Sequence, residues 1–287
     1  MSKGKDRKYS RLRDVWRRLC KNKLAIVGMC IVILFVLVAI FADLIAPYHY
    51  AEMNVRDNLL YPQRGHWLGT DDMGRDILSR IIYGGRVSLL LSLTSLVMSL
   101  AVGGILGCVA GFFGGKTDAV IMRFVDILMS IPALLLAVAV ATVMGGGMLS
   151  TSVAMAVSGM APSVRILRST ILKIRENEFV EAARATGSNS MRIILVHILP
   201  NSLAPIIVDA SLRIGGSIMV ISMLSFIGLG VSPPMAEWGS MLNQGLAYIR
   251  DFYPLVTFPG LAIMLTLFGF NVFGDGLRDA LDPRLKQ

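Results

Sequence analysis

Residues 24–42 read LAIVGMCIVILFVLVAIFA and contain no Asp, Glu, Lys or Arg. A bilayer core about 30 Å thick is crossed by roughly 20 helical residues, so this stretch is long enough to span a membrane. In the whole chain of 287 residues, 54% are hydrophobic and 16% are charged, whereas about a quarter of a soluble domain is charged. We therefore expect an integral membrane protein.

Other charge-free stretches predict further spanning helices. Residues 87–115 and 252–274 are each long enough for one crossing. Residues 127–164 are too long for one, and the glycines at 145–147 near their middle favour two helices joined by a tight turn. The first of these two helices is expected to begin near Ala119.

A fifth helix is expected from about residue 204 to residue 229, because this stretch is apolar except for Asp209 and Arg213. Together with the segment at the N-terminus, six spans result, and an even number leaves both termini on the same side. The predicted fold class is an all-α membrane protein with six transmembrane helices.

The positions of lysine and arginine predict the orientation. Of the 28 in the chain, 21 fall on the side of the N-terminus once the six spans are drawn. Cytoplasmic segments carry an excess of these residues, so both termini are expected in the cytoplasm. The predicted parts are a basic cytoplasmic segment, an anchor helix, an extracytoplasmic loop, a five-helix transmembrane domain containing a cytoplasmic loop (165–202), and a cytoplasmic tail: residues 1–23, 24–46, 47–86, 87–274 and 275–287.

The basic N-terminal segment has helical periodicity. Apolar residues recur at spacings of three and four between the lysines and arginines, which predicts an amphipathic helix on the inner membrane face: Leu12, Val15, Trp16, Leu19 and Cys20. The first span lacks the small-residue cleavage site of a signal peptide, so we expect an uncleaved anchor.

Several functional classes are disfavoured by composition. The net charge of +9 follows from the topology and does not indicate nucleic-acid binding. The cysteines offer no pair in an external loop, and no Cys/His cluster has metal-ligand spacing. His49, His66 and His197 have no partners nearby in sequence, so no metal site is expected.

Enzyme signatures are also weak. Gly115, Lys116 and Thr117 resemble the end of a phosphate-binding loop, but Ala110 occupies the position of its first glycine and a spanning helix precedes it where a strand is required. A serine protease within the membrane needs a histidine base at the same depth, and all three histidines lie in loops. The chain itself is not expected to be an enzyme or to hold a cofactor.

The cytoplasmic loop 165–202 carries the most specific signal. Residues 177–187 read NEFVEAARATG, in which Asn177 is suited to cap a helix start and Gly187 to end the helix in a left-handed conformation. A second helix is expected to follow up to Pro200. Two short helices are thus predicted to lie across the membrane surface.

This loop resembles the EAA motif of the permeases of ATP-binding-cassette (ABC) importers. The match consists of Glu181, Ala182, Ala183, Gly187, Leu199 and Pro200, with His197 replacing the usual isoleucine. The peptide-importing branch commonly has this histidine. Residues 69–80 (GTDDMGRDILSR) and 270–284 also resemble the dipeptide/oligopeptide/nickel permease family, so the likeness covers residues 24–284.

The resemblance implies the fold of type I ABC importer permeases and a transport role. It implies a sister permease, two ATPase subunits that bind Mg-ATP, and an extracytoplasmic solute-binding protein that delivers peptides. The EAA loop, with Glu181 foremost, would then couple the ATPases to alternating access in the cell membrane. Nickel chelates or glutathione are alternative substrates within the family. A proton-coupled carrier is an alternative from another class, for which Asp209 is the main candidate.

Other residues allow two interpretations each. Asp209 and Arg213 lie on one helical face and predict an ion pair, which is either structural or part of the transport pathway. Arg75 and Asp76 are expected in a solvated helix start, with contact to the binding protein as the alternative. The glycines Gly103, Gly107 and Gly111 predict a close helix neighbour, in this chain or in the sister permease. The prolines at 132 and 162 can kink their spans.

Overall fold

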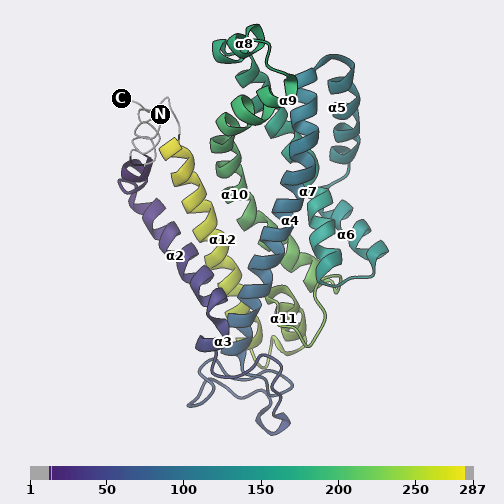
Figure 1. Ribbon diagram of the computed structural model, residues 1–287. Helices are drawn as coiled ribbons and strands as arrows, with labels where there is room; N and C mark the ends of the chain where they lie inside the picture. The colour runs from purple at the N-terminus through teal and green to yellow at the C-terminus, as the bar shows by residue number, and fades with distance from the viewer. Residues whose placement is uncertain (1–12, 14, 282–287) are drawn as a thin grey trace.

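The computed structural model describes residues 13 and 15–281, which form long antiparallel helices (Figure 1). No strand occurs in this part of the chain. Four helices are long and apolar enough to cross a membrane: α2 (Lys23–Ile40), α4 (Ile77–Phe113), the continuous helix Ser190–Phe226 that ends in α10 (Leu199–Phe226), and α12 (Pro254–Leu281). The all-α membrane fold is therefore confirmed.

The third predicted span is broken. It consists of α5 (Gly115–Ser130) and α6 (Ala133–Met144), whose axes differ by 89°. The break falls at Pro132, which has no N–H to donate and forces Ile131 into an extended conformation. This bent pair brings the number of candidate spans to five. The sequence predicted only a kink at Pro132, whereas the structure has two separate helices on either side of it.

The sixth long helix is α7 (Met148–Arg175). Serines, threonines and a proline make it less apolar than the others, so composition alone does not mark it as a span. All three glycines before it, at residues 145–147, have positive φ angles of 83°, 77° and 91°, which confirms the predicted glycine turn. The helix continues to Arg175, eleven residues past the predicted end at Val164.

The most extensive contact between two helices of the described chain is that of α4 with α7. A Cβ atom added to Gly103 would lie 2.6 Å from Ser163 Cβ, and one added to Gly107 would lie 2.8 Å from Leu167 Cβ. Gly111 meets the same neighbour one turn further on. The partner of this glycine series is therefore α7 of the same chain, because only glycine allows the two backbones to approach so closely.

The start of α2 and the end of α12 lie side by side at one end of the molecule (Figure 1). Leu19, from the basic segment, is buried against Ala25 and Ala280, which fits the apolar face predicted for this segment. Leu12 lies outside the described residues. Both ends of the described chain are thus on the same side, as an even number of spans requires.

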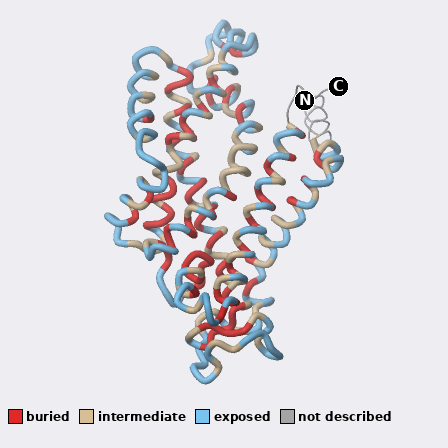
Figure 2. Tube along the Cα trace, turned by 180° about the vertical axis from the view of Figure 1, so that it is seen from behind, coloured by how far each residue is buried: buried red, intermediate tan, exposed pale blue. Residues whose placement is uncertain are grey.

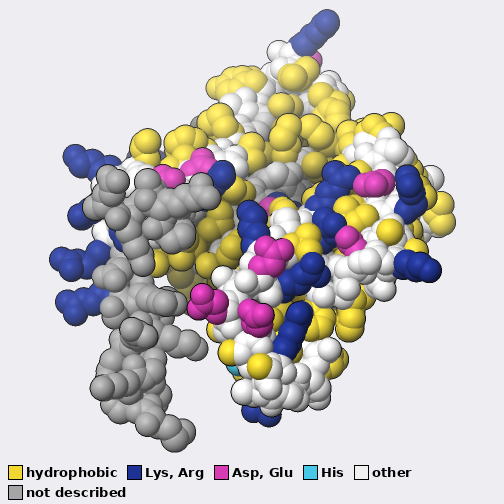
Figure 3. Space-filling view, turned by 90° about the horizontal axis from the view of Figure 1, so that it is seen from above, with side chains coloured by type: hydrophobic (Ala, Val, Ile, Leu, Met, Phe, Trp, Pro, Cys, Tyr) yellow, Lys and Arg dark blue, Asp and Glu magenta, His cyan; other side chains and the backbone are white. Residues whose placement is uncertain are grey.

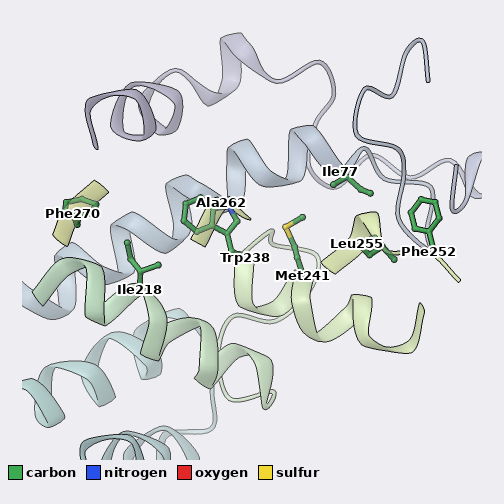
Figure 4. Packing of buried hydrophobic residues seen from close by; sticks show 8 residues of the cluster. All are labelled: Ile77, Ile218, Trp238, Met241, Phe252, Leu255, Ala262 and Phe270. Atoms are coloured by element: carbon green, nitrogen blue, oxygen red, sulfur yellow. The ribbon is translucent and has the colours of Figure 1, made fainter. Parts of the chain in front are cut away.

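At the opposite end, residues 47–76 and the short helix α11 (Trp238–Gly245) form a compact cap, whose buried residues Figure 2 shows in red. Met241 and Phe252 belong to one buried cluster with Ile77, the first residue of α4, and Trp238 packs further along α4, against Gly84 and Gly85 (Figure 4). The cap also includes the short helix α3 (Ala42–Ile45) and a helical turn at Val55–Asp57.

The helix α4 begins inside this cap, at Ile77, ten residues before the expected start of the second span. Asp76 caps it by accepting a hydrogen bond from Ser79 N at 2.7 Å. Arg75 is 1% exposed and Asp76 is 3% exposed. The prediction of a solvated helix start is therefore wrong: the cap folds over these residues and removes them from water.

Candidate functional site

The predicted coupling helix is present as α8 (Glu178–Ala185) at the far end of the molecule from the cap (Figure 1). Its buried side chains, Val180 and Ala183, pack against Phe112 of α4, Ile171 of α7 and Ile193. Glu181 and Ala182 are exposed. The helix is thus amphipathic, with one face anchored to three other helical segments and the other face free.

The end of α8 is as predicted. Gly187 has a φ of +77°, and its N–H and that of Ser188 donate to Arg184 O and Ala183 O, which is the hydrogen-bond pattern of a left-handed helix end. An added Cβ would meet no atom within 4 Å. Glycine is therefore required here by the backbone conformation and not by crowding.

The start of α8 differs in detail from the prediction. Asn177 occupies the N-cap position, but its side chain accepts no hydrogen bond from the helix. Its Nδ2 instead donates to Ile174 O at 2.9 Å. Asn177 therefore closes the end of α7 and joins α7 to α8 through a tight turn.

The second short helix predicted across the membrane surface does not exist as a separate element. A single turn, α9 (Ser190–Arg192), leads through a π-helical segment (Ile193–Ile198) directly into α10, so the helix is continuous across Pro200. The wider π-helical turn accommodates Pro200, which cannot donate to a carbonyl one turn earlier. Leu199 and Pro200 thus lie at the start of α10, and Ile194 and Ile198 just before them are buried.

Charged side chains surround the base of α8. Arg168 of α7 binds both carboxylate oxygens of Asp118 on α5, and Arg175 donates to Gly111 O at 3.0 Å. The guanidinium of Arg184 lies 5.5 Å from the ring centre of Phe112. Figure 3 looks onto this end and shows basic and acidic side chains close together on it.

The predicted pair of Asp209 and Arg213 is formed, but it is the longest of the four hydrogen bonds of the arginine. Arg213 Nη1 lies 3.4 Å from Asp209 Oδ2. The same guanidinium donates to Ser163 Oγ at 2.6 Å and to Gly159 O at 2.5 Å on α7, and to Ser99 Oγ on α4 at 3.3 Å. Arg213 therefore joins α10 to α4 and α7. Its positive charge is stabilised by these oxygen acceptors as well as by Asp209.

Sequence reasoning missed a second polar cluster, which lies in the cap. Asp71 Oδ2 accepts from Arg75 Nε at 2.6 Å and lies 3.4 Å from Arg80 Nε. Both guanidinium groups also donate to Gln244 Oε1 on α11. These four residues tie the segment before α4 to α11. A high density of charges in residues 71–80 was the available signal.

The buried carboxylate of Glu237 is a second link between α4 and α11. Glu237 accepts hydrogen bonds from Gly239 N and Ser240 N, which caps α11, and from Ser88 Oγ on α4 at 3.2 Å. Burial raises its pKa above the ordinary value, and these hydrogen bonds act in the opposite direction.

No group of three His, Cys, Asp or Glu side chains among the described residues is placed to hold a metal ion. His66 does have a partner that its sequence neighbourhood did not reveal: its Nδ1 lies 3.0 Å from Asp76 Oδ1. Lys116 lies in the first turn of α5, directly after the helix α4 and not after a strand. The phosphate-loop context is therefore lacking, as predicted.

These features together describe a helical membrane permease in which α8 is anchored on one face and exposed on the other. The chain belongs to the family of binding-protein-dependent transport system inner membrane components, whose match covers residues 103–287. Residues 10–62 match the N-terminal TM domain of oligopeptide transport permease C.

Individual proteins support this assignment. The chain is 46% identical to the dipeptide transport system permease protein DppC of Alkalihalophilus pseudofirmus, with 96% of this chain and 90% of that protein covered. It is 42% identical to the glutathione transport system permease protein GsiD of Pectobacterium atrosepticum, with 96% and 91% covered.

The fold is also similar to a chain of the MetNI methionine ABC transporter in an inward-facing conformation. The TM-score is 0.58 at 19% identity, and the match covers 72% of this chain and 98% of the other. These comparisons confirm the predicted fold and family. They also confirm that the chain is a membrane permease subunit and not an enzyme.

Proposed function

We propose that this chain is one of two permease subunits of an ATP-driven importer that carries dipeptides or short oligopeptides into the cytoplasm. The observation that carries the proposal is α8, whose buried face is fixed to the helical bundle while Glu181 and Ala182 face outward. A partner bound to the exposed face can therefore displace α4 and α7, because Val180 and Ala183 pack against both helices.

In this proposal the ATP is bound by two partner subunits and not by this chain. Glu181 offers a carboxylate to a basic group of an ATPase, and the small side chain of Ala182 lets the two backbones approach. Gly187 sets the angle at which the helix is presented. Closure of the ATPases then displaces α8 together with the ends of α4, α7 and α10, and the transport pathway changes from outward-open to inward-open.

The proposed location is the cytoplasmic membrane, with both termini in the cytoplasm. The excess of lysine and arginine on the side of the N-terminus supports this orientation. The cap then faces the outside of the cell. There a solute-binding protein delivers the substrate to this chain and its sister permease. The family description, which names binding-protein-dependent transport, supports such a partner.

Peptides are the preferred substrate because a relative with 46% identity is a dipeptide permease. Glutathione, which is itself a peptide, is a second candidate because another relative is named for it. A proton-coupled carrier is not favoured. Its best candidate group, Asp209, lies beside the guanidinium of Arg213, and the family is one of binding-protein-dependent systems.

The test is uptake into proteoliposomes that contain this chain with its sister permease and ATPases. We expect uptake of a labelled dipeptide to require internal ATP and external binding protein, and to persist when an ionophore collapses the proton gradient. Uptake that needs the proton gradient but not ATP would contradict the proposal.

A further inference from the structure

An open cavity of about 420 Å³ lies between α4, α7, α10 and the start of α6. Its volume falls within the range of small-molecule sites, about 300–1,000 Å³. Most of the cavity wall is apolar, and four serines from three helices supply its hydroxyl groups: Ser95 and Ser99 of α4, Ser158 of α7 and Ser217 of α10. A mostly apolar wall with a few placed polar groups is typical of a small-molecule site.

Arg213 is the one ionisable residue in the wall of this cavity, among the described residues. Its neighbour Asp209 lines a different cavity, together with Arg278 of α12. A molecule in the first cavity therefore contacts the positive charge of Arg213, whereas the negative charge of Asp209 does not line that cavity. An anionic group is favoured there, because charges interact more strongly away from bulk water.

The guanidinium is held in a fixed orientation. Its four hydrogen bonds all come from Nη1 and Nη2, and they hold it against Ser163, Ser99 and Gly159. The Nε–H group makes none of these bonds. A carboxylate would therefore find a preorganised cation with one unused donor, at little further cost in side-chain entropy.

The hydroxyls provide the complementary function. Ser217 donates to Ile214 O at 2.8 Å and Ser158 donates to Met155 O at 3.0 Å, both within their own helices. Since each hydroxyl proton is used, what each oxygen offers the cavity is a lone pair. The wall thus combines a cation for a carboxylate with acceptors for N–H groups. The carboxyl end of a peptide carries both of these groups.

The bend between α5 and α6 adds to this preference. Ala133, the first residue of α6, borders the cavity, and the positive end of a helix dipole favours an anion. Gly216 lies in the wall opposite, where an added Cβ meets no atom within 4 Å. The cavity is therefore open space and not a tightly packed interior.

We propose that this cavity binds the carboxyl terminus of the transported peptide, and that Arg213 is the residue that recognises its carboxylate. This inference rests on the proposed function, peptide import. It assigns a selectivity for free carboxylates to the membrane subunit itself, in addition to any selectivity of a solute-binding protein.

The test uses cysteine chemistry and needs neither the binding protein nor ATP. Ser217→Cys places a thiol in the cavity of the assembled complex, with the three native cysteines replaced by serine. Gly104→Cys is the control, because Gly104 lines an apolar groove between α4 and α10 without a charged residue. Both are treated with an anionic and with a cationic thiosulfonate reagent.

The rate ratio of anionic to cationic reagent should be about tenfold higher at the Ser217→Cys thiol than at the control, because of the nearby guanidinium. In the Arg213→Gln background this difference should disappear. In the Arg213 background, a dipeptide should protect the thiol, whereas the same dipeptide with a C-terminal amide should not. This last comparison needs no substitution of Arg213, so it holds even if Arg213→Gln fails to fold.

Equal rate ratios at the two positions, equal protection by acid and amide, or a thiol that no reagent reaches would overturn the proposal. Failure of the proposed function is distinguishable from these results. A complex that shows the carboxylate-dependent protection but imports no peptide with ATP would contradict peptide import and leave the site intact.

Discussion

The helix α8 and the cap at the opposite end are both rich in charged residues, but these residues are exposed in α8 and buried in the cap. In α8, Glu178 and Glu181 are exposed, and the buried side chains that attach the helix are the apolar Val180 and Ala183. In the cap, Asp71, Arg75, Arg80 and Glu237 are all almost fully buried and bind one another or the backbone.

The difference shows that charge in a sequence does not by itself mark a contact surface. The cap charges are used within the chain, where they hold α4 and α11 together. Glu178 and Glu181 of α8 form no ion pair with the described residues, so they are free to meet a partner. The comparison predicts that substitutions in the cap affect stability, whereas substitutions on the exposed face of α8 affect transport.

The largest effect is expected from Asp71→Asn. This change keeps the shape of the side chain but leaves two buried guanidinium groups without their shared carboxylate. Breaking a buried ion pair costs about 3–5 kcal/mol, which thermal unfolding of the purified complex should detect. Asp126→Asn is the matched control, since the pair of Asp126 with Arg165 is about half exposed on both sides, and such pairs contribute about 1 kcal/mol or less. Equal effects would contradict the assignment of the cap.

A smaller, local effect is expected from Val180→Ala. The Val180 side chain is fully buried beneath α8, and truncating it removes part of the anchor at a cost of about 2 kcal/mol. Amide hydrogen exchange should accelerate in α8 and remain unchanged in α11. Phe179→Ala is the control, because Phe179 is 42% exposed whereas Val180 is fully buried. If α8 stays protected, another contact must hold it.

The smallest effect on stability is expected from Glu181→Lys. The residue is exposed and no ion pair involves it, so the free energy of unfolding should change by about 0.5 kcal/mol or less. Substrate uptake by the complex should nevertheless fall. A marked loss of stability together with normal uptake would reverse the roles assigned to the two regions.

Local chemistry decided which features the sequence could predict. The span at residues 24–42, the glycine turn at residues 145–147 and the left-handed end at Gly187 all follow from the residues at those positions. Each is a property of a short stretch. The structure therefore agrees with the sequence at these points.

Contacts between distant segments decided the rest. The burial of Arg75 depends on the cap folding over it, and the main partners of Arg213 lie on α4 and α7. Neither contact leaves a mark in the local sequence. The break at Pro132 and the π-helical passage to Pro200 were missed for a different reason: a proline permits a kink, a break or a continuous helix, and packing selects among them.

The central claim is that α8 transmits ATPase movement, and its most direct test is substrate-stimulated ATP turnover by the complex with Gly187→Val. No atom lies within 4 Å of an added Cβ at this position, so the strain comes only from a φ of +77°. A left-handed conformation costs such a residue about 1–2 kcal/mol. Gly187→Asn is the control, because asparagine tolerates this conformation. We predict that Gly187→Val assembles but loses stimulation while Gly187→Asn keeps it. Normal stimulation in the assembled Gly187→Val complex would contradict the claim.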